Sequence, residues 1–572
     1  MTALTVEALG AAADAVERHL AGLVEQRFGS RLFDRDATLW GPEAEEEASV
    51  RLSWVGLPRS SRPLVGEVAA LREQLRERGV DRIVLCGMGG SSLAPEVICA
   101  TAGAPLVVLD SSDPDMVRAA VGPDLERTAV VVSSKSGSTL ETDSQRRAFV
   151  QAFTDAGIDP TERIVVVTDP GSPLDERSRA EGYRVVNADP DVGGRYSALT
   201  AFGLVPSGLA GVDVGQLLDE AEEVADLLAD DDLGNPGLRL GAALGGTEPL
   251  RDKLLFADAG SGIAGLADWA EQLIAESTGK EGTGVLPVVT PAGRPPAQGL
   301  RETADCTVVA LIAADDVELD LGGDDADDAE DTGSTEAGST RSGVASEEGA
   351  GVSTGSRIAV GGPLGAQLLL WEVATVVAGH LLGINPFDQP DVESAKDAAR
   401  QIMAEGGGAT VEPDLTDGAV QVRAAGPGWL PEGSATLTDA VGALLDQLDP
   451  STGYLAVMVY LDRIEHADLA HVQGDLVDRT GRPVTFGWGP RFLHSTGQYH
   501  KGGPAQGVYL QVTGEPREDL AVPGQDFTFG EFVAAQAAGD ARVLAEHGRP
   551  VLRLHLTDQA QGLEQLRRAL AG

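Results

Sequence analysis

The sequence predicts an α/β protein with two or three doubly wound parallel-sheet units and flanking helices. Three observations support this prediction. Short runs of Val, Ile and Leu alternate with segments of helical spacing, a pattern typical of parallel strands joined by crossover helices. The chain has 572 residues, too many for one ordinary domain. Its apolar residues make up 42% of the total, which is enough for each unit to bury a core.

The first part of the chain divides into a helical segment and an α/β unit. Residues 1–65 are expected to be mainly helical, because their apolar residues recur at three- and four-residue spacing. The first α/β unit is expected at 66–240. Its predicted strands are the apolar runs that begin at residues 82, 105, 128, 163 and 183.

A second α/β unit is expected at 241–430, and one segment interrupts it. Residues 314–356 are acidic, rich in Gly and Ser and almost free of large apolar side chains. This composition predicts a disordered surface insertion, best interpreted as a tolerated loop extension. A regulatory or calcium-binding role is the alternative, although the acidic spacing does not fit an EF-hand.

The C-terminal part, 431–572, again alternates between strand-like and helical patterns. Its predicted strands begin near residues 454, 483, 507 and 550. It is either a third α/β unit or the displaced half of the second one.

Charge and cysteine content restrict the partners and the compartment. With 43 basic against 89 acidic residues, the formal net charge is −46, which argues against a nucleic-acid partner. The sequence has no run of about 18 apolar residues, so no transmembrane helix is expected. The N-terminus lacks the basic region of a signal peptide. Three cysteines make no disulfide framework. A cytoplasmic protein without a membrane partner is therefore expected.

Two turns after neighbouring predicted strands are rich in anion-binding groups. The first strand of the α/β unit ends in a glycine turn that includes Ser91. The strand at 128 ends in a cluster of hydroxyls around one lysine: Ser134, Lys135, Ser136, Ser138 and Thr139. Ligands of parallel sheets bind beyond the carboxyl ends of the strands, where helix-start amides also favour anions. Both turns together predict a pocket for a phosphorylated small molecule.

Five segments in one order carry a family resemblance: residues 87–91, 134–139, 193–197, 276–280 and 387–396. Together they resemble the signature segments of glucose-6-phosphate isomerases, which are built from sugar-isomerase (SIS) domains. The most specific are Gly193-Gly194-Arg195 and the segment from Phe387 to Lys396. The resemblance implies that the predicted sheets are SIS-type units.

The resemblance also implies an activity and roles for individual residues. Such enzymes open the ring of glucose 6-phosphate and move a proton between C2 and C1 through a cis-enediol, without metal or cofactor. The implied phosphate ligands are Ser91, Ser134, Lys135, Ser136 and Thr139. Arg195 would stabilise the enediolate, Gln389 would line the sugar, and Lys396 would serve ring opening. A homodimer is the implied assembly.

The chain departs from the family pattern in its second half. It has no histidine between His19 and His380, and the family's Gly-Glu-Pro segment does not follow residues 276–280. Residues 488–503 resemble the missing segment but come after the 387–396 motif. This order is similar to the rearranged form of the enzyme that is associated with transaldolase.

The rearrangement leaves the catalytic base and the ring-opening group open. Glu276 is the preferred base, with Glu281 as the alternative. His494 and His500 are both candidates for ring opening, because they lie in a Gly-rich stretch just after a strand. Lys501 is a substitute cation.

Two other functions are compatible with part of the pattern. A non-catalytic sugar-phosphate sensor would explain the missing base segment, but sensors of this type usually carry a DNA-binding module, and no basic segment is present. An isomerase of another phosphosugar, such as mannose 6-phosphate or an amino sugar, is the second alternative. The His-rich site and the N-terminal cysteine that those enzymes would need are absent from the sequence.

Overall fold

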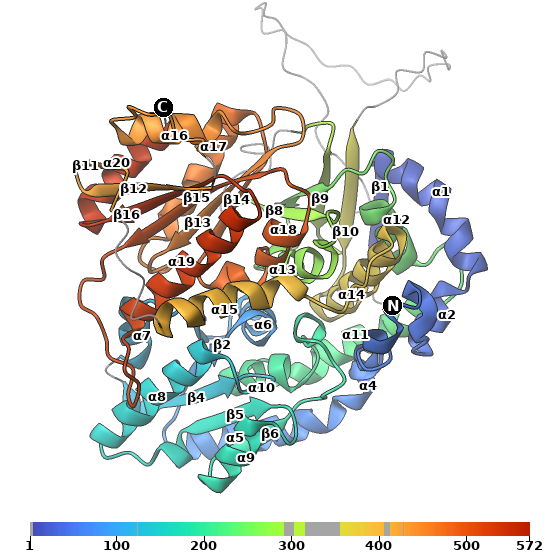
Figure 1. The fold of residues 1–572 in the computed structure, drawn as a ribbon. Helices are drawn as coiled ribbons and strands as arrows, with labels where there is room; N and C mark the ends of the chain where they lie inside the picture. The colour runs from blue at the N-terminus through green and yellow to red at the C-terminus, as the bar shows by residue number, and fades with distance from the viewer. Residues whose placement is uncertain are drawn as a thin grey trace, which may run out of the picture.

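Three sheets with flanking helices make up the protein (Figure 1). The computed structural model describes residues 4–122, 124–290, 302–314, 355–404, 412–426 and 428–571, without the side chains of 392, 393, 395, 396 and 404. The predicted insertion 314–356 lies almost entirely outside the described residues. The predicted α/β class with several parallel units is confirmed.

The first sheet is wholly parallel and has the strand order β3-β2-β4-β5-β6. Its strands are β2 (Arg82–Gly87), β3 (Val107–Leu109), β4 (Thr128–Ser133), β5 (Ile164–Thr168) and β6 (Arg184–Asn187). All five were predicted from their apolar runs. The helices of this unit are α5 (Arg62–Glu77), α6 (Leu93–Thr101), α7 (Pro114–Val121), α8 (Leu140–Asp155), α9 (Pro173–Ala180) and α10 (Ala201–Ala210).

The second sheet has the order β1-β10-β9-β7-β8, and only β1 is antiparallel to its neighbour. Its strands are β1 (Thr5–Gly10), β7 (Lys253–Asp258), β8 (Leu286–Val289), β9 (Cys306–Ile312) and β10 (Ser356–Gly361). Strand β1 was not predicted in the mainly helical N-terminal segment. It is a strand because it pairs with β10, which lies about 350 residues away in the sequence.

The other helices before residue 405 come from the N-terminal segment and from residues 214–404. From the N-terminal segment come α1 (Ala11–Glu25), α2 (Phe28–Phe33), α3 (Glu45–Ala48) and α4 (Leu57–Ser60). Helix α11 (Val214–Ala229) ends the predicted first unit, and α12 (Pro236–Gly245) crosses its predicted boundary at residue 240. From the second unit come α13 (Leu266–Thr278) and α14 (Leu364–Leu382), followed by α15 (Pro390–Ala404).

The C-terminal part forms its own six-stranded sheet, with the order β11-β12-β16-β15-β13-β14. Its strands are β11 (Leu415–Asp417), β12 (Val420–Ala425), β13 (Tyr454–Tyr460), β14 (Val484–Trp488), β15 (Gly507–Gly514) and β16 (Val551–Leu556). Its helices are α16 (Leu437–Leu445), α17 (Val472–Thr480), α18 (Gly497–Gly502), α19 (Phe529–Glu546) and α20 (Gln559–Ala571). Helix α19 lies against α15 (Figure 1).

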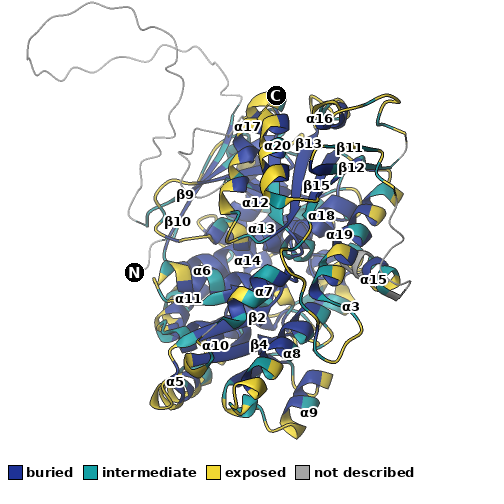
Figure 2. Ribbon diagram, turned by 90° about the vertical axis from the view of Figure 1, so that its left-hand side faces the viewer, coloured by how far each residue is buried: buried dark blue, intermediate teal, exposed yellow. Residues whose placement is uncertain are grey.

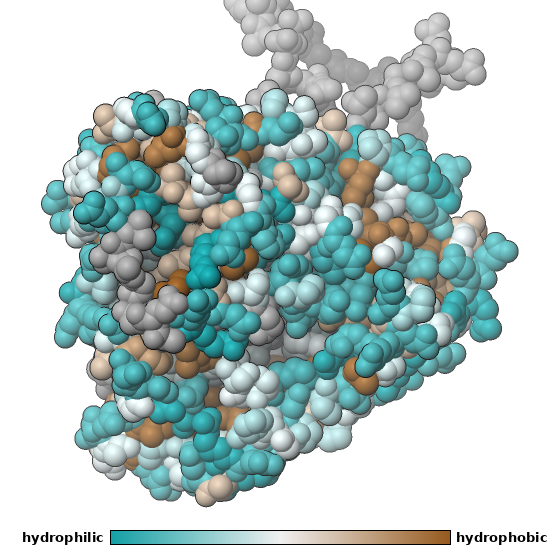
Figure 3. All heavy atoms as spheres, in the orientation of Figure 1, coloured by the Kyte–Doolittle hydropathy of each residue, from teal (hydrophilic) through white to brown (hydrophobic). Residues whose placement is uncertain are grey.

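Burial differs between the strands and the outer helices. The strands β2 and β4 are buried, whereas α5 and α20 expose their outer faces (Figure 2). On the face shown in Figure 3, hydrophilic residues predominate and hydrophobic ones form small, separate patches. This surface agrees with the strongly acidic composition.

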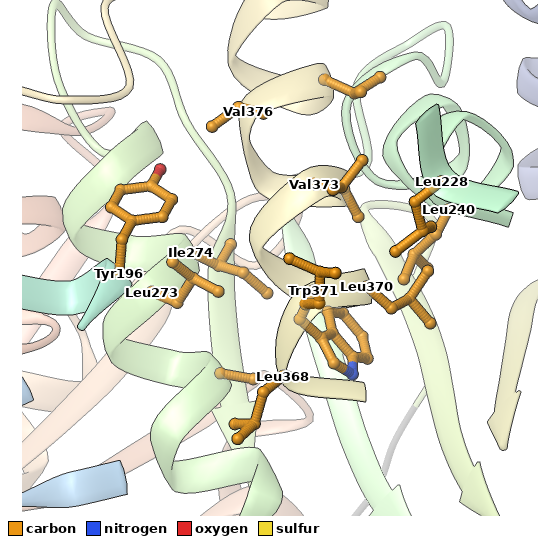
Figure 4. Close-up of a cluster of buried hydrophobic side chains, with 14 of the residues drawn as sticks. Tyr196, Leu228, Leu240, Leu273, Ile274, Leu368, Leu370, Trp371, Val373 and Val376 are labelled. Atoms are coloured by element: carbon orange, nitrogen blue, oxygen red, sulfur yellow. The ribbon is translucent and has the colours of Figure 1, made fainter. Parts of the chain in front are cut away.

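Helix α14 forms the centre of the largest core. Figure 4 shows Trp371 and Val373 of α14 among side chains of neighbouring helices, with Leu228 and Leu240 on one side and Ile274 on the other. By length and composition α14 could cross a membrane, but 89% of its apolar window is buried inside the fold. It is therefore interpreted as the core helix that holds α11, α12 and α13 together.

Candidate active site

Four segments from distant parts of the sequence meet beyond the carboxyl end of β2: η3 (Gly89–Ser91), η6 (Gly194–Tyr196), α13 and η8 (Arg491–His494). Glycine is required at the contact. A Cβ at Gly90 would lie 1.9 Å from the carbonyl oxygen of Gly194. Gly89 has a φ of +56°, and a Cβ there would lie 2.8 Å from Gln272 Nε2 and 3.1 Å from His494 Cβ. The glycine turn thus brings the predicted site segments into contact.

The hydroxyl loop follows β4, the strand next to β2. Ser134 Oγ donates to Thr139 Oγ1 at 3.2 Å, and the hydroxyls of Ser136 and Ser138 lie 2.6 Å apart. Thr139 is the N-cap residue of the 16-residue helix α8, but its side chain makes no capping hydrogen bond. The loop therefore combines four hydroxyls with a helix N-terminus, the combination that favours an anion.

The other two predicted phosphate ligands differ in how free they are. Lys135 Nζ forms an ion pair with Asp169 at 2.7 Å and donates to the carbonyl oxygen of Pro190 at 2.9 Å. Its charge is thus already balanced beside the loop. Ser91 is half-buried in the turn that follows β2, and its Cβ approaches the end of that strand at Gly87.

Arg195 is the most densely bonded side chain of the site and is 3% exposed. Its Nε donates to Ser277 Oγ at 2.7 Å and its Nη1 to Gln389 Oε1 at 2.6 Å. Its Nη2 donates to the backbone carbonyls of Pro386 and Asp388 at 2.7 and 3.0 Å. These bonds fix the guanidinium plane and place the predicted sugar ligand Gln389 directly against it.

Glu276 lies beside this guanidinium. Its Oε1 is 3.7 Å from Arg195 Nη1, and its Oε2 accepts a hydrogen bond from Gln272 at 3.0 Å. Glu276 is 8% exposed and lies in the last turn of α13. The preferred base and the predicted cation are therefore neighbours. Glu281, the alternative base, is exposed.

Lys280 connects the α13 segment to the 387–396 motif. Its Nζ donates to Asp388 Oδ1 at 2.6 Å and to the carbonyl oxygens of Asn385 and Asp388 at 2.7 and 2.6 Å. Burial lowers the pKa of Lys280 to about 8. Lys280 thus holds in place the loop whose carbonyls also bind Arg195.

The two candidate histidines have very different environments. His494 Nε2 lies 3.3 Å from Glu141 Oε1, near the start of α8, and the residue contacts the glycine turn at Gly89. His500 is 2% exposed and lies among the rings of Tyr454 and Tyr509, with centroid distances of 5.9 and 5.3 Å. Burial lowers the pKa of His500 well below its usual range. Only His494 is brought to the meeting point of the four segments.

Two predicted lysines remain to be placed. Lys396 belongs to α15, but its side chain lies outside the described residues. Lys501, the substitute cation, forms a buried ion pair with Asp540 at 2.6 Å and is 4% exposed. The charge of Lys501 is therefore balanced inside the C-terminal unit by Asp540.

Sequence reasoning missed two polar residues at the site. Gln272 precedes Glu276 by one helical turn, so its i,i+4 spacing was an available signal. Glu141 follows the hydroxyl loop by two residues, and an acidic residue in the first turn of a helix is usually interpreted only as a stabilising charge. Its contact with His494, more than 350 residues away, exists only in the tertiary structure.

Comparisons with known proteins identify similar sequences. No protein-family model matches the chain. It is 30% identical over 357 residues to a probable glucose-6-phosphate isomerase of Haloarcula marismortui, covering 59% of this chain and 81% of that protein. It is 31% identical over 381 residues to a glucose-6-phosphate isomerase of Rubrobacter xylanophilus, covering 59% of this chain and 86% of that one.

Solved structures share the fold. A hypothetical protein from Thermus thermophilus has a TM-score of 0.55 at 24% identity, over 70% of this chain and all of that chain. A glucose-6-phosphate isomerase from Chlamydia trachomatis has a TM-score of 0.50 at 20% identity, over 68% of this chain and 86% of that one.

Proposed function

The chain belongs to the glucose-6-phosphate isomerase family, and from this membership we infer that it interconverts glucose 6-phosphate and fructose 6-phosphate. In the structure, the observation that best supports this inference is the pairing of Glu276 with Arg195, 3.7 Å apart, beside the glycine turn. Proton transfer through an enediolate needs a carboxylate to move the proton and a cation to stabilise the charge. This pair supplies both groups.

Substrate binding begins at the hydroxyl loop. We assign the phosphate to the hydroxyls of Ser134, Ser136 and Thr139 and to the N-terminus of α8, with Ser91 contributing from the neighbouring turn. The ammonium group of Lys135 is a further donor beside the loop, and Asp169 balances its charge. In a chain with a net charge of −46, such a local concentration of donors is what holds a phosphate.

Ring opening requires one group that moves a proton between two oxygens of the sugar. We assign this role to His494: its imidazole takes the proton of the C1 hydroxyl, the C1–O5 bond breaks with its electron pair moving to O5, and O5 takes the proton back. The position of His494 against the glycine turn supports this assignment. Lys396, to which the family resemblance also assigns ring opening, stays a prediction from the sequence.

Isomerisation follows on the open chain. The Glu276 carboxylate removes the proton from C2, the C1–C2 double bond forms, and O1 takes up a proton to complete the cis-enediol. Glu276 then returns its proton to C1 while O2 loses one and becomes the ketone. Arg195 stabilises the negative charge that develops on the oxygens, and Gln389 holds the sugar next to it.

The setting of the reaction is also a proposal. We propose a cytoplasmic homodimer that acts on a freely diffusing sugar phosphate, without nucleic acid or membrane. The net charge of −46 and the free, buried cysteines Cys86, Cys99 and Cys306 support this setting. Light scattering coupled to size-exclusion chromatography would test the dimer.

The direct test is turnover of fructose 6-phosphate to glucose 6-phosphate in EDTA, coupled to glucose-6-phosphate dehydrogenase. We expect turnover without added metal. Residual metal in the sample must be measured, so that the turnover can be attributed to the metal-free protein. Mannose 6-phosphate and an amino-sugar phosphate serve as comparison substrates. Binding of the sugar phosphate without turnover would contradict the isomerase and favour a sensor.

A further inference from the structure

A cavity of about 490 Å³ lies where all three units meet. Its lining comes from Leu93 of α6 in the first unit, from α13 and the end of β8 in the second, and from η7 (Ala467–His471), α17, β14 and η8 in the third. Its volume is in the range of small-molecule sites. None of the residues assigned above to the sugar phosphate is among the described residues that line it. The cavity is therefore separate from the candidate active site.

Two carboxylates of α13 line this cavity. Asp268 and Glu271 are three residues apart, so they are neighbours on the helix surface. Glu271 Oε1 accepts a hydrogen bond from Ser495 Oγ at 3.1 Å. Burial raises the pKa of Asp268, and burial and then the nearby Asp268 raise the pKa of Glu271 to about 8. Asp468 and His471 also line the cavity, and both are exposed.

The guanidinium groups beside the cavity are already paired with other carboxylates. Arg491 lines the cavity and forms ion pairs with Glu96 and Asp110 at 2.5 Å each. Arg463 joins the same two carboxylates at 3.0 and 3.2 Å. Two guanidinium groups thus balance two carboxylates. Within the described residues, the two carboxylates of α13 form no ion pair, and such an excess of negative charge favours a bound cation.

Aromatic side chains form another part of the lining. Phe486 and Trp488 are two residues apart on β14, so they point to the same face of the sheet. Their ring centroids lie 5.1 Å apart with an interplanar angle of 74°, and both residues are partly exposed. The faces of such rings attract cations, and their apolar surface takes up the body of an organic ligand.

Gln473 adds an acceptor to the lining and is 4% exposed. Its Nε2 donates to the carbonyl oxygens of Val289 and Val484 at 3.0 and 2.6 Å, which fixes the orientation of the amide. Its Oε1 has no hydrogen-bond partner among the described residues. A buried acceptor normally has a partner, so a ligand that donates hydrogen bonds suits this cavity.

The donor set favours an organic cation over a metal ion. In the part of the chain that the structure describes, no group of three or more His, Cys, Asp and Glu side chains is arranged to hold a metal. Carboxylates and an amide oxygen accept hydrogen bonds from an ammonium group, and aromatic faces attract it.

We propose that this cavity binds a small organic ammonium ion, with the charged group at Asp268 and Glu271 and an apolar body against Phe486 and Trp488. The site is independent of the proposed isomerase activity. It would be a second ligand site of the protein, built from all three units.

Isothermal titration calorimetry of the full-length protein at neutral pH tests the site with 2-phenylethylamine as the probe. The neutral 2-phenylethanol is the matched ligand, because it keeps the ring and replaces the ammonium by a hydroxyl. For a ligand of this size we expect a Kd of about 0.1–1 mM for the amine, and a Kd at least about 10-fold higher for the alcohol.

Four variants locate the bound amine. Asp268→Asn and Glu271→Gln each remove one negative charge, and Trp488→Leu removes an aromatic face. We expect each of the three to raise the Kd of the amine by about 5- to 10-fold. Glu46→Gln is the control, because it removes one exposed charge away from the cavity and should leave the Kd unchanged. Asp268→Asn, at an exposed residue, carries the test if Glu271→Gln does not fold.

Three results would overturn the amine site. The first is equal binding of the amine and the alcohol, or no amine binding up to about 10 mM. The second is an unchanged Kd in the folded Asp268→Asn and Glu271→Gln proteins. The third is loss of amine binding in a saturating equilibrium mixture of glucose 6-phosphate and fructose 6-phosphate, which would place the amine in the candidate active site. Each of these results leaves the isomerase standing, because turnover tests that function separately.

Discussion

Gln498 and Asp391 lie 107 positions apart in the sequence and are joined by two hydrogen bonds. The backbone N–H of Asp391 donates to Gln498 Oε1 at 3.0 Å, and Gln498 Nε2 donates to Asp391 Oδ2 at 2.7 Å. Gln498 Nε2 also donates to the carbonyl oxygen of Gly279 at 2.9 Å. One buried amide therefore connects the 488–503 segment, the start of α15 and the end of α13. Segments that lie far apart along the chain are therefore adjacent in space.

Replacing this amide should destabilise the protein. Gln498→Leu leaves the Asp391 amide and the Gly279 carbonyl without their partner, so we expect a loss of about 1–3 kcal/mol in the free energy of unfolding. Urea denaturation measures it. Gln151→Leu is the control, because the amide of Gln151 makes one exposed bond to Asp155, and its cost should stay below about 0.5 kcal/mol. Equal losses in both variants would contradict the connecting role.

Glu276→Gln tests the base. The amide keeps the size of the side chain but cannot accept the C2 proton, so kcat should fall by about three orders of magnitude. The coupled assay measures kcat and KM. Glu281→Gln is the control from the same segment and should keep wild-type activity, because Glu281 is exposed. Reversed results would move the base to Glu281.

Arg195→Lys should strongly reduce activity, although the substitution keeps the positive charge. A lysine cannot donate at once to Ser277, Gln389 and the two backbone carbonyls that the guanidinium holds. We expect kcat/KM to fall by about 100-fold or more. Arg59→Lys, in an exposed ion pair with Glu222, is the control and should leave kcat/KM unchanged. Full activity of Arg195→Lys would exclude the precise guanidinium geometry as a requirement.

Two glycines with the same backbone angle test the hydroxyl loop. Gly137 and Gly157 both have a φ of +71°, so alanine strains the backbone at either position. A Cβ at Gly137 would also lie 2.4 Å from Leu174 Cβ, whereas a Cβ at Gly157 would meet nothing within 4 Å. Gly137→Ala should therefore displace the loop and raise KM for the sugar phosphate by about 10-fold or more. Gly157→Ala should change stability alone, and a similar KM for both variants would argue against phosphate binding by this loop.

Glu271 should make stability depend on pH. It lines a cavity of about 490 Å³ beside η8, and burial and then the nearby Asp268 raise its pKa to about 8. Because this pKa is above the unfolded value, the folded state binds the extra proton, and the stabilisation is complete below about pH 4.5. It is lost as the pH rises toward 8.

Denaturation of the wild type and Glu271→Gln at pH 5 and pH 8 checks this expectation. The free energy of unfolding of the wild type, relative to that of Glu271→Gln, should be lower at pH 8 than at pH 5. The exposed Glu46→Gln is the control for the loss of one negative charge. A difference that does not change with pH would show that Glu271 does not titrate in this range.

Much of the fold could be predicted because strand formation here is a local property. Apolar β-branched runs such as β4 and β5 are buried on both faces, so their composition alone marks them as strands of a parallel sheet. Strand β1 lacks such a run, with alternating and partly exposed residues. Strand β1 forms because it is hydrogen-bonded to β10. The local sequence of β1 does not indicate that partner.

The sequence by itself determined the α/β class, all five strands of the first sheet and four of the six strands of the third. It also supplied the residues proposed for the chemistry, including Arg195 and Glu276. Tertiary structure alone decided which of His494 and His500 lies at the glycine turn. Both follow the same strand, six residues apart, in the same kind of segment. One contacts the glycine turn and Glu141, while the other fills a space among tyrosines. The physical reason is that elements distant in the sequence set the environment of a side chain. The residues next to a histidine in the sequence do not specify those elements.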